Sequence, residues 1–234
     1  MDWNCRLFPE IKDQMLDPSS AVEGMCEMAN RFSVDRFCLL PDFDPTKEAL
    51  SIFLLRRSKW ERAIQSPLTS STPSVKVKMA ARAILTENLY QEPLLHKLVL
   101  PNGYLALSLP VGAYSDWIDQ AINRLLYQAN MTKLILTSFD LCVMLYPDDV
   151  IQRLLRIPHL IIQINYASLT DPKIQRLIPQ LMRQNRIILL GTSINSLDRV
   201  YHYEFDYYTK SATDHIPIAD YQTMLRRSNR FWLK

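Results

Sequence analysis

The first residues of the chain place three polar side chains, Asp2, Asn4 and Arg6, at every second position. Side chains of a strand alternate between its two faces, so a strand here would carry this triplet on one face and apolar residues on the other. Burying carboxylate, amide and guanidinium groups costs free energy unless they are paired. The spacing therefore predicts a strand that delivers polar groups to a site, or to the remains of one.

Other catalytic designs find little support in the sequence. The four histidines, His96, His159, His202 and His215, do not fall at the carboxyl ends of the predicted strands, so we interpret each as a surface or packing residue rather than a base. With only four glycines and no Gly-x-Ser-x-Gly element, neither a nucleophile elbow nor a phosphate-binding glycine loop can be drawn. A Ser-His-Asp triad stays open, because a triad is defined by geometry.

Composition narrows the class of protein. A chain of 234 residues with 48% hydrophobic content can bury a large core, and we expect one domain over residues 1–234. A net charge of +3, from 27 basic and 24 acidic residues, argues against a nucleic-acid partner. Four cysteines without Cys-x-x-Cys spacing indicate a reducing compartment and argue against a zinc site. No stretch reaches the roughly 18 apolar residues of a membrane span, so we expect a soluble, cytoplasmic protein.

Two hydrophobic periods alternate along the chain. Apolar or alternating stretches predict strands at 1–10, 36–40, 75–84, 104–109, 133–138, 159–164 and 186–191. Helical periodicity and capping residues predict helices at 21–31, 44–65, 115–129, 147–156 and 171–184, and two more after 196. The Ser-, Thr- and Pro-rich segment 66–74 is predicted as a surface loop, and 94–100 as a short helix or an irregular crossing.

Seven strands separated by helices predict a parallel sheet, and near-continuous apolar strands predict burial on both faces. We therefore expect an α/β fold of the TIM-like (β/α)7 type, closed or nearly closed. Functional groups of such barrels lie at the carboxyl ends of the strands. The candidate site residues at those ends are Asn4, Arg6, Asp42, Arg82, Ser138, Asp140, Asn165, Ser193 and Asn195.

The strand ends also follow a known series of motifs. Asp2, Asn4, Arg6 and Pro9 fall on the frame Asp-x-His-x-His-x-x-Pro. Leu-Pro-Asp-Phe (40–43) falls on Thr-Pro-His-His, and Ala-Ala-Arg (80–82) falls on Gly-Ala-Glu. Thr-Ser-Phe-Asp-Leu-Cys (137–142) falls on Ala-His-Pro-Glu-Arg-Tyr. Gln-Ile-Asn-Tyr-Ala-Ser-Leu (163–169) falls on Gln-Ile-Asn-Ala-Gly-Ser-Leu, and Thr-Ser-Ile-Asn-Ser (192–196) falls on Ser-Asp-Ala-His-Asn. Over nearly its whole length the chain thus resembles the PHP (polymerase and histidinol phosphatase) superfamily, specifically the manganese-dependent tyrosine-protein phosphatases of capsule and exopolysaccharide operons, the CpsB type. The resemblance implies a distorted barrel.

The resemblance also implies which chemistry has changed. In the family the matched positions hold metal ligands, mostly His, Asp and Glu, around cations that activate water to attack a phosphate ester. This chain has other groups there: Asn4, Arg6, Asp42, Arg82, Ser138, Ser193 and Asn195. Asn and Ser oxygens ligate such metals weakly, and a guanidinium has no acceptor at all. The substrate-binding Arg of the family is replaced by Leu141. These departures predict a pseudoenzyme with no metal cofactor.

Two classes of function follow from the resemblance. We favour a binding or regulatory module in polysaccharide biosynthesis, whose partner would be a bacterial tyrosine kinase or a phosphotyrosine segment. The alternative is an active phosphotyrosine-protein phosphatase, or another phosphoester hydrolase, with a rebuilt site. In either case Arg6 and Arg82 are the candidate anion-binding residues. We expect them to pair with Asp2, Asp42 and Asp140 in a buried network, or to leave a cationic cup for a phosphate.

Overall fold

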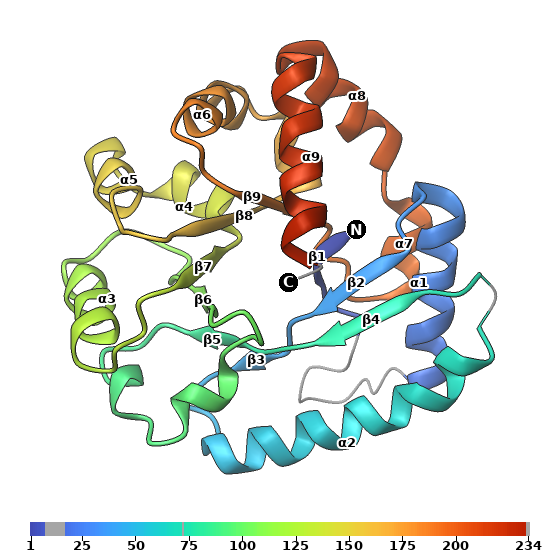
Figure 1. Cartoon of the computed structure of the whole chain (residues 1–234), viewed down its shortest axis with the longest axis horizontal. Coiled ribbons are helices and arrows are strands. Elements are labelled where there is room, and N and C mark those ends of the chain that lie inside the picture. Colours follow the sequence, from blue (N-terminus) through green and yellow to red (C-terminus); the bar gives the residue numbers. More distant parts are fainter. Residues whose placement is uncertain (8–16, 72, 233–234) are drawn as a thin grey trace.

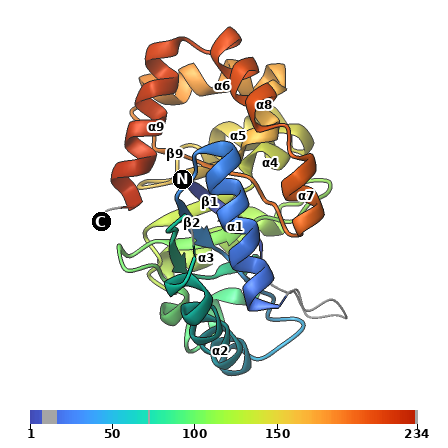
Figure 2. The ribbon, with the colours of Figure 1, turned by 90° about the vertical axis from the view of Figure 1, so that its right-hand side faces the viewer.

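A computed structural model describes residues 1–7, 17–71 and 73–232 of the chain. Strands lie in the middle of the molecule, and helices lie around them (Figure 1). Viewed from the side, α6, α8 and α9 lie toward one end of the molecule and α2 lies at the other (Figure 2). No helix within the described ranges has the length and apolar character needed to cross a bilayer.

All strand pairs in the described residues are parallel, as predicted. They form two sheets, ordered β1-β2-β4 and β3-β5-β6-β7-β8-β9. The strands are β1 (Asp2–Cys5), β2 (Arg36–Leu39), β3 (Asp42–Phe43), β4 (Lys76–Met79), β5 (Arg82–Ile84), β6 (Leu105–Ser108), β7 (Leu134–Thr137), β8 (Ile161–Asn165) and β9 (Ile188–Gly191). The mixed α/β class with parallel sheets is confirmed, whereas this topology of two sheets does not confirm a closed barrel.

The two sheets separate where two strands are interrupted. The segment predicted as one strand at 75–84 is divided into β4 and β5, and β2 is followed by a short strand, β3, that we did not predict. Pro41 lies in the break between β2 and β3, where it has no N–H to donate to a neighbouring strand. Backbone bonds still cross the breaks, from Ala80 N to Leu39 O (3.0 Å) and from Arg82 N to Pro41 O (2.9 Å). The interrupted strands therefore remain neighbours from one sheet to the other.

The helices are α1 (Pro18–Phe32), α2 (Leu50–Thr69), α3 (Trp117–Tyr127), α4 (Phe139–Leu145), α5 (Asp148–Leu154), α6 (Pro172–Arg183), α7 (Leu197–His202), α8 (Phe205–His215) and α9 (Ile218–Trp232). Two begin as the sequence predicts, because the carboxylates of Asp17 and Asp171 accept from backbone N–H groups of the first turn, and proline follows each. Short 3-10 turns fill part of the ambiguous stretch 94–100.

Three helical predictions are wrong in detail. Asp44 caps a separate turn, accepting from Thr46 N (3.0 Å) and Thr46 Oγ1 (2.7 Å), and α2 begins six residues later at Leu50. The same helix continues past Pro67 into the segment predicted as a loop. Helix α4 was not predicted, and the tail forms α7, α8 and α9 instead of two helices. In each case local turn chemistry was mistaken for, or concealed, a helix boundary.

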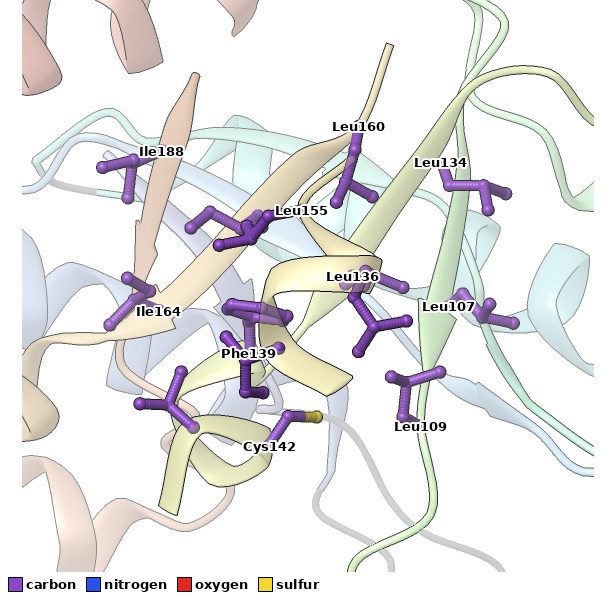
Figure 3. Close-up of a cluster of buried hydrophobic side chains, with 14 of the residues drawn as sticks. Leu107, Leu109, Leu134, Leu136, Phe139, Cys142, Leu155, Leu160, Ile164 and Ile188 are labelled. Atoms are coloured by element: carbon purple, nitrogen blue, oxygen red, sulfur yellow. The ribbon is translucent and has the colours of Figure 1, made fainter. Parts of the chain in front are cut away.

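Apolar side chains fill the space between sheets and helices. The largest cluster lies between the six-stranded sheet and its covering helices, and Figure 3 shows part of it, including Leu107, Leu136 and Phe139. A smaller cluster is formed by residues of both sheets, among them Trp3 and Ile135. Phe231 of α9 packs against this cluster, with its ring 5.1 Å from that of Trp3. The inner faces of the two sheets therefore share one apolar interior.

Candidate functional site

Four side chains at the carboxyl ends of β1, β8 and β9 form a closed cycle of hydrogen bonds. Asn4 Nδ2 donates to Ser193 Oγ (2.8 Å) and to Gln163 Oε1 (3.2 Å). Ser193 Oγ and Gln163 Nε2 both donate to Asn165 Oδ1, at 2.6 and 3.3 Å. We call Asn4, Gln163, Asn165 and Ser193 the amide ring. All four groups are neutral at physiological pH, so the ring can be buried without a counter-charge.

Backbone geometry fixes the amide ring in place. Ser138 N donates to Gln163 Oε1 (2.7 Å), and Ser193 N donates to Asn4 O (3.0 Å). Ser138 and Ser193 both have positive φ, 50° and 55°, which is uncommon for a residue with a Cβ. Asn4 Oδ1 is the exception in this satisfied network, because it is buried and has no hydrogen-bond partner in the described part of the chain. The ring thus contains one unused acceptor.

Gly191 allows β9 to approach β1 closely. A Cβ at this position would lie 2.7 Å from Asn4 Cβ, 2.8 Å from Asn4 N and 2.9 Å from Gln163 Nε2. Contacts of this length are shorter than van der Waals separations, and one of them involves the backbone. Glycine at the end of β9 is therefore required for the amide ring to form.

The carboxylates of Asp2 and Asp140 lie beside the ring and are buried. Asp140 accepts from Asn165 Nδ2 (3.0 Å) and Ser168 Oγ (2.6 Å), and Asp2 accepts from the N–H of Thr192 (3.0 Å). Burial raises the pKa of both carboxyl groups, and these hydrogen bonds partly oppose the rise. Neither forms an ion pair with a described residue, so the expectation that they pair with arginines is wrong.

A charged group lies next to the ring, just after β1 and where β3 and β5 begin, directly after the ends of β2 and β4. Arg82 donates to both oxygens of Asp42, through Nε at 2.5 Å and Nη2 at 2.8 Å, and Arg6 Nη2 donates to Asp42 Oδ2 at 2.9 Å. The Arg82 side chain is 7% exposed, whereas those of Arg6 and Asp42 are 21% and 22% exposed. We call these three residues the guanidinium cluster. Bidentate pairing of this kind fixes Arg82 firmly, and leaves Arg6 nearer to solvent.

Positive charge accumulates around Arg6. Burial lowers the pKa of Arg6 most, the charges of Arg82 and Arg199 lower it further, and Asp42 opposes this. Among the described groups that act on Arg6, two are therefore cations and one is a carboxylate. Arg199 lies on α7 and is exposed, and nothing in its sequence context singled it out.

The structure places the predicted site residues in two groups and leaves one outside. Asn4 and Ser193 belong to the amide ring, which Ser138 and Asp140 contact, while Arg6, Asp42 and Arg82 form the guanidinium cluster. Asn195 is exposed and belongs to neither, and the motif residue Pro9 lies outside the described residues. Gln163, Ser168 and Thr192 also contribute, and none of them was named as a candidate site residue. All three lie in the motif stretches 163–169 and 192–196, and Gln163 is also a polar residue within an apolar strand.

The donor chemistry of the two groups fits a divalent cation poorly. The described residues contain no group of three or more His, Cys, Asp or Glu side chains placed to hold a metal. Asp42 already accepts from two guanidinium groups, and a guanidinium both lacks a lone pair and repels a cation. What these residues can do instead is hold an anion or position one another.

Comparison with known proteins supports the fold. A solved structure is similar, with a TM-score of 0.64 over 91% of this chain and 87% of the other, at 13% sequence identity. It comes from crystallographic work on YwqE from Bacillus subtilis and CpsB from Streptococcus pneumoniae, described there as unique metal-dependent tyrosine phosphatases. No protein-family model and no curated protein matches the chain. The chain therefore has the mixed α/β fold, with parallel sheets, of a metal-dependent tyrosine phosphatase.

Proposed function

We propose that this protein is a non-catalytic member of the PHP type that binds a phosphate-bearing partner at the guanidinium cluster. The observation that carries the proposal is the convergence of Arg82 and Arg6 on a single carboxylate, Asp42, at strand ends where the resembling phosphatases hold metal. Guanidinium groups recognise phosphate oxygens through paired, charge-assisted hydrogen bonds. The cluster therefore has the chemistry of a phosphate receptor.

The proposed architecture is a distorted barrel in one domain. Arg6 N donates to Ile194 O (2.8 Å) and Ser193 N donates to Asn4 O (3.0 Å), so the segment after β9 lies against β1. Together with the backbone bonds across the breaks in β2–β3 and β4–β5, these contacts support a ring of seven strands. Such a ring would gather all the strand ends at one mouth.

Absence of catalysis is proposed from the chemistry of the groups. Hydrolysis of a phosphate ester needs an activated nucleophile or a metal-bound water. Ser193 Oγ, the one hydroxyl of the amide ring, donates its proton to Asn165 Oδ1, and an amide oxygen is no general base. This geometry supports binding over the alternative, a phosphatase or other hydrolase with a rebuilt site.

The ligand we propose is a phosphotyrosine segment of a partner protein. The similar solved structures are of tyrosine phosphatases, and the motif resemblance points to capsule and exopolysaccharide operons, where a bacterial tyrosine kinase would be the partner. A protein that binds such a segment without hydrolysing it would protect or sequester the phosphorylated form. A cytoplasmic location and a regulatory role in polysaccharide biosynthesis belong to the same proposal.

Binding of a fluorescent phosphotyrosine peptide tests this function. We expect saturable binding to the wild type and a loss of about tenfold or more in affinity for Arg6→Gln, because a charge-assisted hydrogen bond contributes about 1.5–3 kcal/mol. Arg62→Gln is the matched control, since Arg62 is an exposed residue of α2 outside the cluster. The unphosphorylated peptide should not bind. Equal affinity of wild type and Arg6→Gln would overturn the proposal.

A further inference from the structure

A second polar region lies at the opposite ends of the strands, where β8 and β9 begin. A cavity of about 520 Å³ opens there, and its lining includes Tyr104, Arg156, His159, Asn185 and Arg186. A volume of this size falls within the range that accommodates small-molecule ligands. None of the residues that line this cavity belongs to the guanidinium cluster.

The lining of the cavity is cationic. It contains two arginines and a histidine, Arg156, Arg186 and His159, and no carboxylate. Two further cations adjoin it, since Arg227 donates to Asn185 Oδ1 (2.9 Å) and Lys133 Nζ lies 5.8 Å from the centre of the Tyr104 ring. None of these arginines or Lys133 forms an ion pair with a described residue.

Arg186 is held in place by groups that do not neutralise its charge. Its Nη1 donates to Ile157 O (3.2 Å) and its Nη2 donates to Leu155 O, both just beyond the end of α5. These carbonyls carry only partial negative charge, so capping the helix end orients the guanidinium and offsets part of its charge, with no carboxylate to neutralise it. The side chains of Arg156 and His159 make no hydrogen bond with any described residue. One cation is thus fixed, and two groups remain available to a ligand.

The sequence contains a matching regularity. Basic residues stand at or just before the first residue of five strands, and they are Arg36, Lys76, Lys133, His159 and Arg186. Since the strands are parallel, these residues share one edge of the sheets; Arg36 is paired there with Asp35 (3.7 Å), and the other basic groups attract anions. The field and the cavity therefore point to the same kind of ligand.

We propose that this cavity binds a small polyanion carrying two or more phosphate groups. Several uncompensated cations require more than one negative charge, and arginine pairs well with phosphate oxygens. Arg186 would provide the fixed contact, Arg156 and His159 would close on the ligand, and Tyr104 would supply an aromatic wall. This site would be independent of the guanidinium cluster.

Calorimetric titration with inorganic pyrophosphate tests the proposal. The titrations use an Arg6→Gln background, so that the guanidinium cluster contributes as little as possible, and a salt concentration near 0.15 M, where diffuse surface attraction is screened. We expect one saturable site, weakened about tenfold or more by Arg156→Ala, as loss of a charged contact requires. His159→Asn should also weaken binding, and asparagine tolerates the positive φ of 53° at this position.

Arg183→Ala is the matched control. Arg183 is an exposed residue in the last turn of α6 that does not line the cavity, so this change removes the same charge from nearby surface. We expect its affinity for pyrophosphate to equal that of the background protein. Equal weakening by Arg183→Ala and Arg156→Ala would indicate diffuse attraction and overturn the proposal. So would the absence of saturable binding in a background protein whose thermal unfolding shows it to be folded.

Discussion

The amide ring lies at the carboxyl ends of β1, β8 and β9, and the guanidinium cluster lies where β3 and β5 begin; the two differ in charge and in access to solvent. The ring is neutral, its amides and hydroxyl largely satisfy one another, and Asn4 and Gln163 are fully buried. The cluster is charged, and Arg6 and Asp42 each keep about a fifth of their side chains exposed, at 21% and 22%. Buried neutral networks order a structure, whereas exposed charges remain available to ligands.

This difference indicates separate roles for the two groups. The amide ring is a set of buried polar side chains that serve as one another's partners and need no ion. The charged groups of the guanidinium cluster are partly exposed to solvent, so this is the part of the site that can contact a phosphate. The first role predicts large losses of stability on mutation, and the second predicts losses of binding.

Asp42→Ala should give the largest loss of stability. Arg82 is 6% exposed and would keep its charge with no carboxylate to accept its hydrogen bonds. Breaking a buried pair in this way costs about 3–5 kcal/mol, and the exposure of Asp42 places the expected value at the lower end. Chemical denaturation measures it. Asp149→Ala, which removes a carboxylate from the exposed pair with Arg153, should cost far less, because solvent screens that pair. Similar losses in the two variants would mean that the cluster has no buried part.

Gly191→Ala should disrupt the amide ring by overpacking. The added Cβ would meet Asn4 and Gln163 at less than 3 Å, with the backbone N of Asn4 at 2.8 Å, and we expect a loss of about 1–3 kcal/mol. Gly24→Ala is the control, because its Cβ would meet only the flexible ends of Leu197 and Leu7, at 2.9 and 3.1 Å, and alanine favours the α1 helix. If Gly191→Ala unfolds at the same denaturant concentration as the wild type, the inference that β9 packs closely on β1 at this glycine is wrong.

Asp2→Asn should alter the pH dependence of stability. Burial raises the pKa of Asp2 in the folded state, so the folded protein holds this proton to a higher pH than the unfolded chain. The stability that Asp2 contributes is therefore present below its ordinary pKa of 3.8 and is lost as pH rises through the folded pKa. Each unit of the rise corresponds to about 1.4 kcal/mol.

The measurement compares unfolding free energies of wild type and Asp2→Asn at several pH values. The difference should shift in favour of the variant as pH increases from 3.8 to neutral, and Asp140→Asn should behave in the same direction, because burial also raises the pKa of Asp140. A shift in favour of the wild type over this interval would contradict the account of two carboxyl groups whose pKa is raised by burial.

Arg6→Gln should have the smallest effect on stability. Its ion pair with Asp42 is partly exposed and Asp42 keeps the bidentate contact with Arg82, so we expect a loss below about 1 kcal/mol. Thermal unfolding checks the value. A loss as large as that of Asp42→Ala would make Arg6 a structural residue and remove the contrast between the two regions.

The sequence predicted the parallel α/β class and most strands, because apolar periodicity is local. It also predicted that Asn4 and Ser193 belong together, through motif order. It could not show that Asp44 caps only a turn, or that Pro41 accompanies a change of sheet, because both outcomes depend on neighbouring strands. Nor could it show that the site divides into a ring and a cluster, because the ring depends on a hydrogen bond between Asn4 and Gln163, which are 159 positions apart.

One experiment tests most directly whether the protein binds phosphate without hydrolysing it. Purified wild type is titrated with a phosphotyrosine peptide in the presence of manganese, and bound peptide and released phosphate are measured on the same samples. We expect saturable binding that Arg6→Gln removes, and phosphate release no faster than in buffer alone. Phosphate release that scales with protein concentration and is lost in Ser193→Ala or Asp140→Asn would contradict the proposed function and show a working catalytic site.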